Sequence, residues 1–339
     1  MSPDAMVSIV IVNYNAGALL HRCLESIAWQ TYPSWEVIIV DNASQDQSLR
    51  SVGQFDQVTV IRNSDNMGFA AAQNQGLGLA QGCYLMPLNF DIEMTPRFLD
   101  EMVAAMELSP TIGIVTGKLM AMSTDGRHLN TFYSAGHVMP ANGYALHRGE
   151  GESDHGQYDE MCEVFGAPGA APLYRREMLE DIAFRGQYFD ESLFTWYEDV
   201  DLDWRAQRLG WRCVYTPKAV AYHLGHPEGH GGNLWQLAIG IRNRWLVVLA
   251  NSDFRAGTVH ALLRYEFSLL RYVVRNGYLS AYVNAWKQFL GLMQTALEKR
   301  RWTMQRARSR RSGGKTMLSF EHFTSQSCTA DTKTHMRAT

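Results

Sequence analysis

The chain has 339 residues, 46% hydrophobic and 19% charged, which is enough to bury the core of one large or two modest domains. Its five cysteines are scattered and odd in number, which argues against a disulfide framework and against a zinc site. The N-terminal residues lack the basic segment of a secretory signal, and no window of 18 apolar residues occurs. The sequence therefore predicts a cytoplasmic protein with reduced thiols and no membrane-spanning helix.

Charge is distributed unevenly along the chain. Residues 1–234 carry 14 Lys and Arg against 29 Asp and Glu, whereas residues 235–311 carry 14 against 3 and are rich in aromatic side chains. Basic segments of this kind bind anionic surfaces. We expect three regions, namely an acidic body at 1–232, a basic aromatic helical region at 233–311, and a polar, disordered tail at 312–339.

Four apolar runs in the first 90 residues predict buried strands of a parallel sheet. The runs lie at residues 7–12, 36–40, 58–61 and 84–88, with helical patterns at 18–30 and 69–80. This alternation predicts an α/β fold with a doubly wound, mostly parallel sheet flanked by helices. Later short strands are expected at 112–116, 119–122, 213–216 and 219–222. Residues 124–160 lack periodicity and are expected to form long loops and a hairpin.

A polar cluster follows each of the first four strands. These clusters comprise residues 13–15, 41–46, 63–66 and 89–93. Because ligands bind beyond the carboxyl ends of parallel strands, four clusters on one edge predict a binding crevice. Asp91 and Glu93 lie in the last cluster, and carboxylates suit Mg²⁺ or Mn²⁺, which hold phosphate oxygens. Neither a dinucleotide G-x-G-x-x-G after the first strand nor a P-loop pattern occurs.

A second acidic cluster begins a predicted helix that ends near residue 209. On this helix Glu198, Asp201 and Arg205 share one face, and Asp199 and Asp203 share another. Carboxylates this close repel one another unless a cation, an arginine or a proton intervenes. Aromatic residues surround the cluster, namely Phe194, Trp196, Tyr197 and Trp204. We interpret the cluster as functional rather than as a solvated helix start.

Seven segments, in order across residues 7–223, now carry a family resemblance. They read VSIVIVNYN, EVIIVDNASQD, NMGFAAAQNQG, PLNFD, GAAPLYRREML, FDESLFTWYEDVDLDWRAQRLGW and AVAYH. With these segments the chain resembles the family 2 inverting glycosyltransferases of the GT-A fold, nearest to their rhamnosyltransferase-like branch. A basic helical C-terminal extension also follows the catalytic domain in that branch.

The resemblance implies a role for each matching residue. Asp41 would hydrogen-bond the pyrimidine, and the rest of the nucleotide pocket would comprise Asn13, Asn15, Asn66, Gly68, Asn74 and Asn89. A divalent cation, Mg²⁺ or Mn²⁺, would be held by Asp91 and His223. Asp199 would be the catalytic base, with Glu198 beside it. The acceptor would contact Trp196, Asp201 and Arg205.

The chain departs from the branch at three places. Asn89 replaces the first acid of the D-x-D-type motif, Phe90 stands where proline is usual, and Ala171 and Pro172 replace bulky residues. The expected function is transfer of a sugar, rhamnose favoured, from a dTDP- or UDP-sugar to a lipid-linked or cell-surface glycan. One alternative is a catalytically weak nucleotide-sugar-binding protein, because Asn89 removes an acid. A pyrophosphorylase sharing the sheet is disfavoured because its Gly-rich N-terminal signature is absent.

The basic C-terminal region has its own set of interpretations. Aromatics interleaved with Lys and Arg are typical of helices that lie on anionic lipid, which would place the protein peripherally on the inner face of the plasma membrane. The alternatives are a helical hairpin packed on the body and a contact in a homo-oligomer. Nucleic-acid binding is disfavoured because no recognition module accompanies the basic residues.

Overall fold

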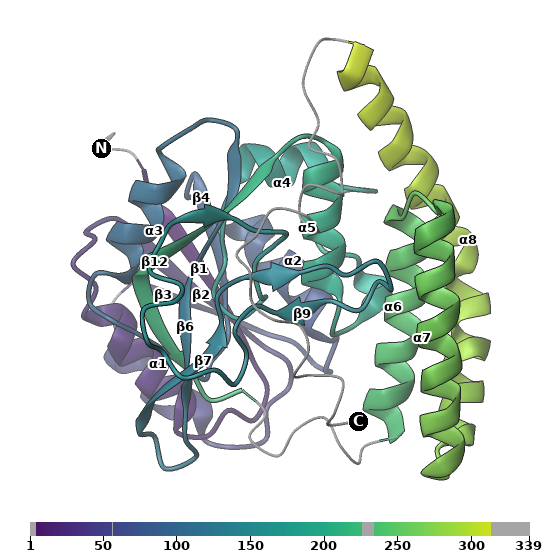
Figure 1. Cartoon of the computed structure of the whole chain (residues 1–339). Helices are drawn as coiled ribbons and strands as arrows, with labels where there is room; N and C mark the ends of the chain where they lie inside the picture. Colours follow the sequence, from purple (N-terminus) through teal and green to yellow (C-terminus); the bar gives the residue numbers. More distant parts are fainter. Residues whose placement is uncertain (1–4, 56, 226–233, 313–339) are drawn as a thin grey trace.

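The structure is a computed structural model that describes residues 5–55, 57–225 and 234–312. In these ranges a ten-stranded mixed sheet forms the centre of the body, and helices cover both of its faces (Figure 1). The main path of the sheet has the order β10-β12-β6-β11-β4-β1-β2-β3, while β5 pairs with β12 and β7 with β6. The predicted α/β fold with a mostly parallel sheet is confirmed.

The N-terminal half of the sheet is parallel, as predicted. It contains β1 (Val7–Asn13), β2 (Trp35–Asp41), β3 (Val58–Arg62) and β4 (Tyr84–Leu88). Alternate residues of β1 face opposite layers, because successive side chains of a strand point to opposite faces. Ile9 and Ile11 pack in the cluster that includes α1 (Leu19–Ala28) and α3 (Phe98–Met106). Val10 and Val12 pack in the cluster that includes α2 (Phe69–Leu79), α4 (Arg176–Ile182) and α5 (Glu198–Arg208).

The other half of the sheet is mixed. Each predicted pair of short strands forms one long strand, β6 (Ile112–Met122) and β12 (Arg212–His223), with an irregular register between Thr216 and Val220. Antiparallel β11 (Leu173–Arg175) lies between β4 and β6. The remaining short elements are β5 (Ile92–Met94), β7 (His128–Ser134), β8 (His137–Val138), β9 (Leu146–His147), β10 (Cys162–Glu163), η1 (Ser48–Gln54) and η2 (Glu191–Leu193).

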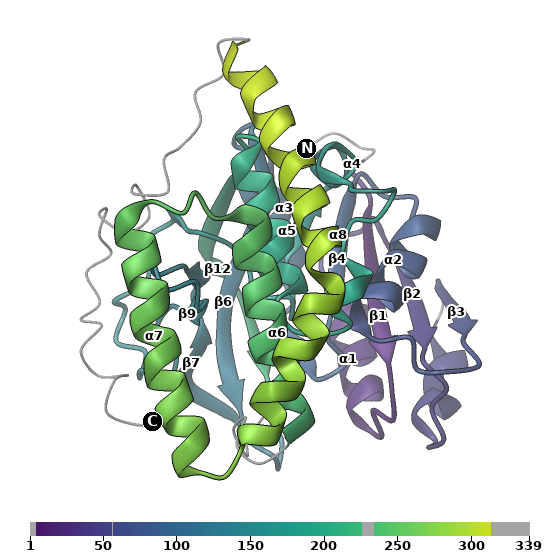
Figure 2. The ribbon, with the colours of Figure 1, turned by 90° about the vertical axis from the view of Figure 1, so that its right-hand side faces the viewer.

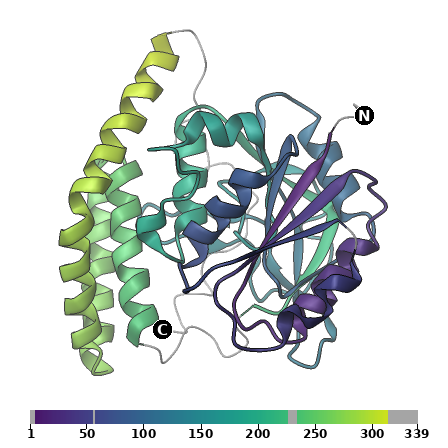
Figure 3. The same ribbon diagram turned by 180° about the vertical axis from the view of Figure 1, so that it is seen from behind.

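Three helices form a layer beside the body: α6 (Leu234–Asn251), α7 (Ala256–Arg275) and α8 (Leu279–Ser312). Figure 2 shows α6 between the other two, with α8 crossing it and α7 at the outer edge. From behind, the helical layer stands at one side of the body (Figure 3). No helix in the described ranges is both long and apolar enough to cross a bilayer.

The helical layer shares buried contacts with the body. Lys299 of α8 is 1% exposed and pairs with Asp190 and with Asp201, the latter at 2.9 Å. The predicted boundary at 232/233 falls in residues 226–233, outside the described ranges, as does nearly all of the predicted tail. The boundary therefore stays a prediction, although the layer and the body have a common interior.

Candidate active site

Two of the predicted nucleotide residues, Asn13 and Asp41, lie side by side because β1 and β2 run in register. The buried Asn13 amide donates to Asp41 Oδ1 at 2.7 Å, to Ser44 Oγ at 3.0 Å and to Ser48 Oγ at 2.9 Å. Asn13 therefore orients the Asp41 carboxylate and the loop that follows it. Asn15, at φ 53°, accepts from the Gln45 backbone N–H at 2.8 Å and fixes the same loop.

The N-terminus of α2 is held by an amide that the sequence analysis did not single out. The buried Asn42 donates to the Gly68 carbonyl at 3.1 Å and to Asn66 Oδ1 at 3.3 Å. Gly68 has φ 84°, and a Cβ there would lie 2.5 Å from the Phe194 ring, so a larger residue would clash. The only sequence signal for Asn42 was its place inside the 41–46 polar cluster.

Asn74 and Asn89 occupy different settings from those expected of pocket residues. The Asn74 amide donates to the Phe189 carbonyl at 2.8 Å and to Glu191 at 2.9 Å, and it accepts from the Phe189 N–H at 2.9 Å. Contact with a nucleotide through Asn74 would require these bonds to break. We therefore infer that Asn74 joins α2 to the segment before η2. Asn89 is half-buried just beyond β4, and its N–H donates to the Ala170 carbonyl at 2.9 Å.

The structure brings together the two predicted metal ligands, Asp91 in the turn between β4 and β5 and His223 at the end of β12. His223 Nε2 lies 3.1 Å from Asp91 Oδ1, and the Gly225 N–H donates to Asp91 Oδ2 at 3.1 Å. Burial raises the pKa of Asp91, but His223 and the Gly225 N–H outweigh this effect and hold that pKa below its usual range. Glu93, in contrast, is paired with Arg22 at 2.5 Å and with His128 at 2.9 Å.

The donor set at Asp91 and His223 fits a divalent cation that is shared with a substrate. A carboxylate and an imidazole converge there, and the buried His223 Nδ1 has no hydrogen-bond partner. Across the described part of the chain, no group of three or more His, Cys, Asp or Glu side chains is placed to hold a metal ion. Ions such as Mg²⁺ are commonly held by one or two carboxylates together with substrate phosphates.

Backbone N–H groups of the small-residue segment at 165–172 donate to carboxylates of α5. The Gly169 N–H donates to Asp199 Oδ2 at 2.8 Å, and the Ala167 N–H donates to Asp203 Oδ2 at 2.9 Å. A Cβ at Gly166 would lie 2.0 Å from Asp203 Oδ2. The run of Gly and Ala therefore lets backbone approach two carboxylates that side chains would otherwise cover.

Burial changes the pKa of two of the carboxyl groups of α5. Burial raises the pKa of Glu198 well above its ordinary value, and the neighbouring Asp199 raises it further. Burial also raises the pKa of Asp203 to about 7, although His137 acts in the opposite direction. A raised pKa favours the protonated form of a carboxyl group, so Glu198 is the weaker candidate for the base. Asp199, whose side chain is 16% exposed, is the better candidate.

A row of rings that the sequence analysis did not single out connects the two acidic sites. His223 packs edge-on against Tyr133 at 4.2 Å between centroids, Tyr133 lies 4.9 Å from His147, and His147 lies 5.2 Å from His137. His137 lies between the α5 carboxylates, with Nε2 3.9 Å from Asp199 and Nδ1 3.5 Å from Asp203. Three of these rings come from residues 124–160, whose high His content was the only signal.

Two of the three predicted acceptor residues are interior residues instead. Asp201 and Arg205 are 0% and 1% exposed and form a salt bridge at 2.9 Å, which Asn251 and Lys299 extend. The structure therefore contradicts their predicted contact with an acceptor, because both side chains are buried. Both faces of α5 are buried, since α6 and α8 cover the one that carries Asp201 and Arg205. Trp196 is half-buried.

Known proteins share parts of this sequence. An uncharacterized glycosyltransferase of Haemophilus influenzae is 34% identical over 110 residues, which cover 32% of this chain and 37% of that protein. The N-acetylglucosaminyl-diphospho-decaprenol L-rhamnosyltransferase of Mycobacterium tuberculosis is 27% identical over 253 residues, covering 66% and 78%. The chain thus spans about two fifths of the Haemophilus protein and of a Bacillus subtilis glycosyltransferase, EpsE.

Solved glycosyltransferases share the fold. GalNAc-T7 with UDP, GalNAc and Mn²⁺ superposes with a TM-score of 0.59 over 75% of this chain and 49% of its own, at 18% identity. The Pyrobaculum calidifontis mannosyltransferase PcManGT, with GDP-Man and Mn²⁺, gives 0.54 over 93% and 89%, at 16% identity. The predicted GT-A fold is therefore confirmed. The family model described as glycosyl transferase family 2 matches residues 8–183, more than half of the chain, and the chain belongs to that family.

Proposed function

We propose that the protein transfers a sugar from a nucleotide diphosphate to a hydroxyl group of an acceptor, with inversion at the anomeric carbon. The observation that carries this proposal is the setting of Asp199, a partly exposed carboxylate held by the Gly169 N–H at one end of the row of rings. Asp199 takes the proton of the acceptor hydroxyl. At the same time the hydroxyl oxygen bonds to the anomeric carbon, and the bond from that carbon to the diphosphate breaks. A single displacement of this kind inverts the configuration.

A divalent cation, Mg²⁺ or Mn²⁺, fits this proposal and would be held by Asp91 and His223. When bound, it would offset the negative charge that develops on the leaving diphosphate. The Gly225 N–H and His223 keep Asp91 ionised and oriented for that purpose. Two solved glycosyltransferases of the same fold contain Mn²⁺ with a nucleotide or nucleotide sugar, which supports the requirement.

For the donor we propose a pyrimidine nucleotide sugar, with dTDP-rhamnose favoured and UDP-sugars as the alternative. The oriented Asp41 carboxylate is available to accept from a pyrimidine ring, and the α2 N-terminus at Gly68 suits an anion. The Mycobacterium relative is named as a rhamnosyltransferase acting on a decaprenyl diphosphate sugar, which supports rhamnose and a lipid-linked acceptor.

The replacement of Asp199 by asparagine tests the proposal. Asp199→Asn keeps the shape but removes the base, so transfer should fall about 10²–10⁴-fold while donor binding is retained. Transfer is measured as release of UDP or dTDP with Mn²⁺ and an acceptor, and donor binding by calorimetry. Glu107→Gln, at an exposed glutamate of the body, is the matched control. Near-normal transfer by Asp199→Asn would show that Asp199 is not the base. If the wild type binds donor but transfers no sugar, the alternative of a catalytically weak nucleotide-sugar-binding protein is favoured.

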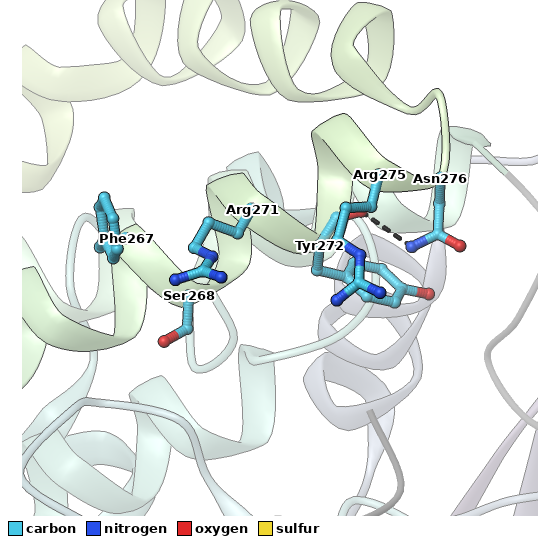
Figure 4. Close-up of a pocket in the computed structure, with 6 residues that line it drawn as sticks. All are labelled: Phe267, Ser268, Arg271, Tyr272, Arg275 and Asn276. Carbon is cyan, nitrogen blue, oxygen red and sulfur yellow. Dashed lines mark hydrogen bonds between the residues drawn. The ribbon is translucent and has the colours of Figure 1, made fainter.

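We further propose that α7 holds the protein peripherally on an anionic membrane at the cytoplasmic face. An exposed apolar stripe runs along one side of α7 at helical spacing: Val259, Leu263, Phe267, Leu270 and Val274. Exposed arginines lie beside it at 264, 271 and 275. Figure 4 shows the Arg271 and Arg275 guanidinium groups on the same side of α7. Both arginines line a hollow of about 690 Å³. Apolar side chains flanked by arginine are typical of helices in the membrane interface.

Only part of the basic region is available to such a surface. Arg242, Arg244, Lys299, Arg300 and Arg310 bond to carbonyls or carboxylates of the protein itself. The attraction should therefore come from the basic residues that stay exposed, among them the arginines of α7, each contributing roughly 1 kcal/mol near an anionic surface.

Vesicle binding tests the role of α7. The wild type should co-sediment with phosphatidylglycerol vesicles at low salt, bind phosphatidylcholine vesicles weakly, and be partly released by high salt. Leu263→Ser with Phe267→Ser should abolish most of this binding, whereas Trp29→Ser with Leu108→Ser, at equally exposed apolar residues of the body, should not. Equal binding by the two double variants would refute a role for α7 and favour a packed helical layer or an oligomer contact.

A further inference from the structure

Three aromatic residues before α5 have unusual backbone conformations. Phe194, Trp196 and Tyr197 have φ values of 66°, 66° and 69°, in the left-handed region. Bulky residues rarely adopt this region, and they remain in it only where the surroundings hold them there. Glu198 and Asp199 follow directly, so the conformation of this segment determines where the first turn of α5 begins.

The residue that holds the segment is Asn243 of α6. Its buried side-chain amide donates to three carbonyls, those of Leu193 at 2.8 Å, Thr195 at 2.8 Å and Trp196 at 2.7 Å. An amide nitrogen carries two hydrogens, so these are shared among three acceptors. An asparagine at this position thus satisfies carbonyls that the turns at 194–197 leave without helix or sheet partners.

Arg242 orients this amide and also binds the 193–197 segment and Ser192 directly. Its Nε donates to Asn243 Oδ1 at 2.8 Å, which fixes the Asn243 nitrogen toward the segment. Its Nη2 donates to the Leu193 carbonyl at 2.9 Å and to the Ser192 carbonyl at 3.3 Å. Arg242 is 7% exposed, so its guanidinium group binds other groups of the protein rather than solvent.

The same segment contacts the proposed nucleotide site at its other side. The Ala70 N–H donates to the Phe194 carbonyl at 3.1 Å, and the Phe194 ring packs against Gly68. Residues 193–197 therefore join three parts of the molecule: the α2 N-terminus, the first turn of α5 with Asp199, and α6.

We propose that Asn243, oriented by Arg242, is a positioning residue that holds the 193–197 segment so that Asp199 and the α2 N-terminus keep their places during sugar transfer. This inference rests on the proposed function. Without the three hydrogen bonds, the aromatic residues relax toward negative φ values and the start of α5 shifts with them. Small misplacements of a catalytic group cost about 10²-fold in rate. The C-terminal helical layer is then part of the catalytic apparatus as well as a proposed membrane contact.

The test compares two buried amides of one helix. Asn243→Ala removes the three hydrogen bonds to the 193–197 segment. Asn251→Ala removes an equally buried amide of α6 that bonds to Asp201 and Val247 instead. We expect Asn243→Ala to increase hydrogen exchange in peptides covering 193–200 and to lower kcat about 10²-fold, with donor Kd nearly unchanged. Asn251→Ala should lower thermal stability without either of these changes. Arg242→Lys, which keeps the charge but removes the bond to Asn243, should give smaller changes in the same direction.

Unchanged exchange protection at 193–200 in Asn243→Ala would overturn the proposal, as would a loss of kcat no greater than that of Asn251→Ala. If Asn243→Ala does not fold, the comparison of Arg242→Lys with Asn251→Ala decides in the same way. A wild-type protein that transfers no sugar would overturn the proposed function, while the exchange data would still decide whether Asn243 holds the segment.

Discussion

At the scale of single residues, burial distinguishes the carboxyl groups of α5 from one another. Glu198 and Asp199 are adjacent in sequence, yet Glu198 is 6% exposed and its Oε2 has no hydrogen-bond partner, whereas Asp199 accepts from the Gly169 N–H. Burial raises the pKa of Glu198 and that of Asp203, the latter to about 7. A site with a base next to proton-holding groups avoids the repulsion that four charges in six residues would create.

The stability of the protein should consequently depend on the state of Glu198. Above pH 4.5 the unfolded chain has lost this proton while the folded protein keeps it, so the free energy of unfolding falls as pH rises toward the folded pKa. One such proton contributes a slope of roughly 1.4 kcal/mol per pH unit. Glu198→Gln removes this contribution, and urea unfolding between pH 5 and 7 should show a flatter dependence than in the wild type.

The matched control for this experiment is Glu107→Gln, because Glu107 is exposed. Asp203 contributes a slope of the same sign in all three proteins and so cancels in the comparison. A Glu198→Gln protein whose pH dependence parallels that of the wild type would mean that Glu198 is ionised in the folded protein.

At the scale of elements, α8 supplies a buried cation to the loop before α5. Burial raises the pKa of Asp190, but Lys299 outweighs this and lowers it to about 2. Asp201 shares the same ammonium group and also binds Arg205. This charge network fixes the long helix α8 to the body. It also sets the position of α8 along the body, which apolar packing alone would not specify.

Removing this cation should destabilise the protein strongly. Lys299→Met leaves Asp190 buried without its partner, and breaking a buried ion pair costs about 3–5 kcal/mol. Because the pKa of Asp190 is lowered in the folded state, the lost stability is present above pH 4 and disappears as pH falls toward 2. Urea unfolding at pH 7 measures the difference. Lys287→Met, at an exposed lysine of the same helix, should change stability little, and equal losses in both variants would contradict the network.

At the scale of the whole molecule, the helical layer and the body form one interior. The cluster around Phe165, Val200 and Trp204 includes Leu246 and Val247 of α6 and Phe289 of α8. Arg208 of α5 also donates to the Asn251 carbonyl and pairs with Asp253 at 2.7 Å, beyond the end of α6. The layer thus covers apolar and charged surface of α5 that would otherwise be exposed.

We expect a chain ending at residue 232 to lose cooperative folding rather than to remain a stable body. Removal of α6 and α8 exposes the Phe165 cluster and leaves Asp190 and Asp201 without Lys299. Both losses count against a usual net stability of only about 5–15 kcal/mol for a domain. Near-UV circular dichroism and a urea titration of residues 1–232 measure this. A chain ending at residue 312 is the control. A sharp unfolding transition in 1–232, with donor binding retained, would contradict the shared interior.

Much of the fold was predictable from the sequence because its signals are local. Apolar runs such as 7–12 specify buried parallel strands whatever surrounds them, and the polar residues after each run fall on one edge by topology alone. Asn13, Asp41, Asp91 and His223 were placed correctly at that edge for this reason. The antiparallel β11 was missed because a three-residue segment, Leu173–Arg175, carries no strand signal without its neighbours in the sheet.

Only the tertiary structure decided which side chains the site can use. Helical spacing put Asp201 and Arg205 on one face of α5, but the sequence does not show that α6 and α8 cover that face and turn the pair into an interior salt bridge. Asn243 lies some fifty residues from the carbonyls it binds, and His137 reaches Asp199 across 62 positions. Contacts at such separations depend on packing rather than on local pattern. The sequence by itself therefore determined the sheet, its polar edge and the family, and tertiary packing decided the burial and positioning of the α5 carboxylates.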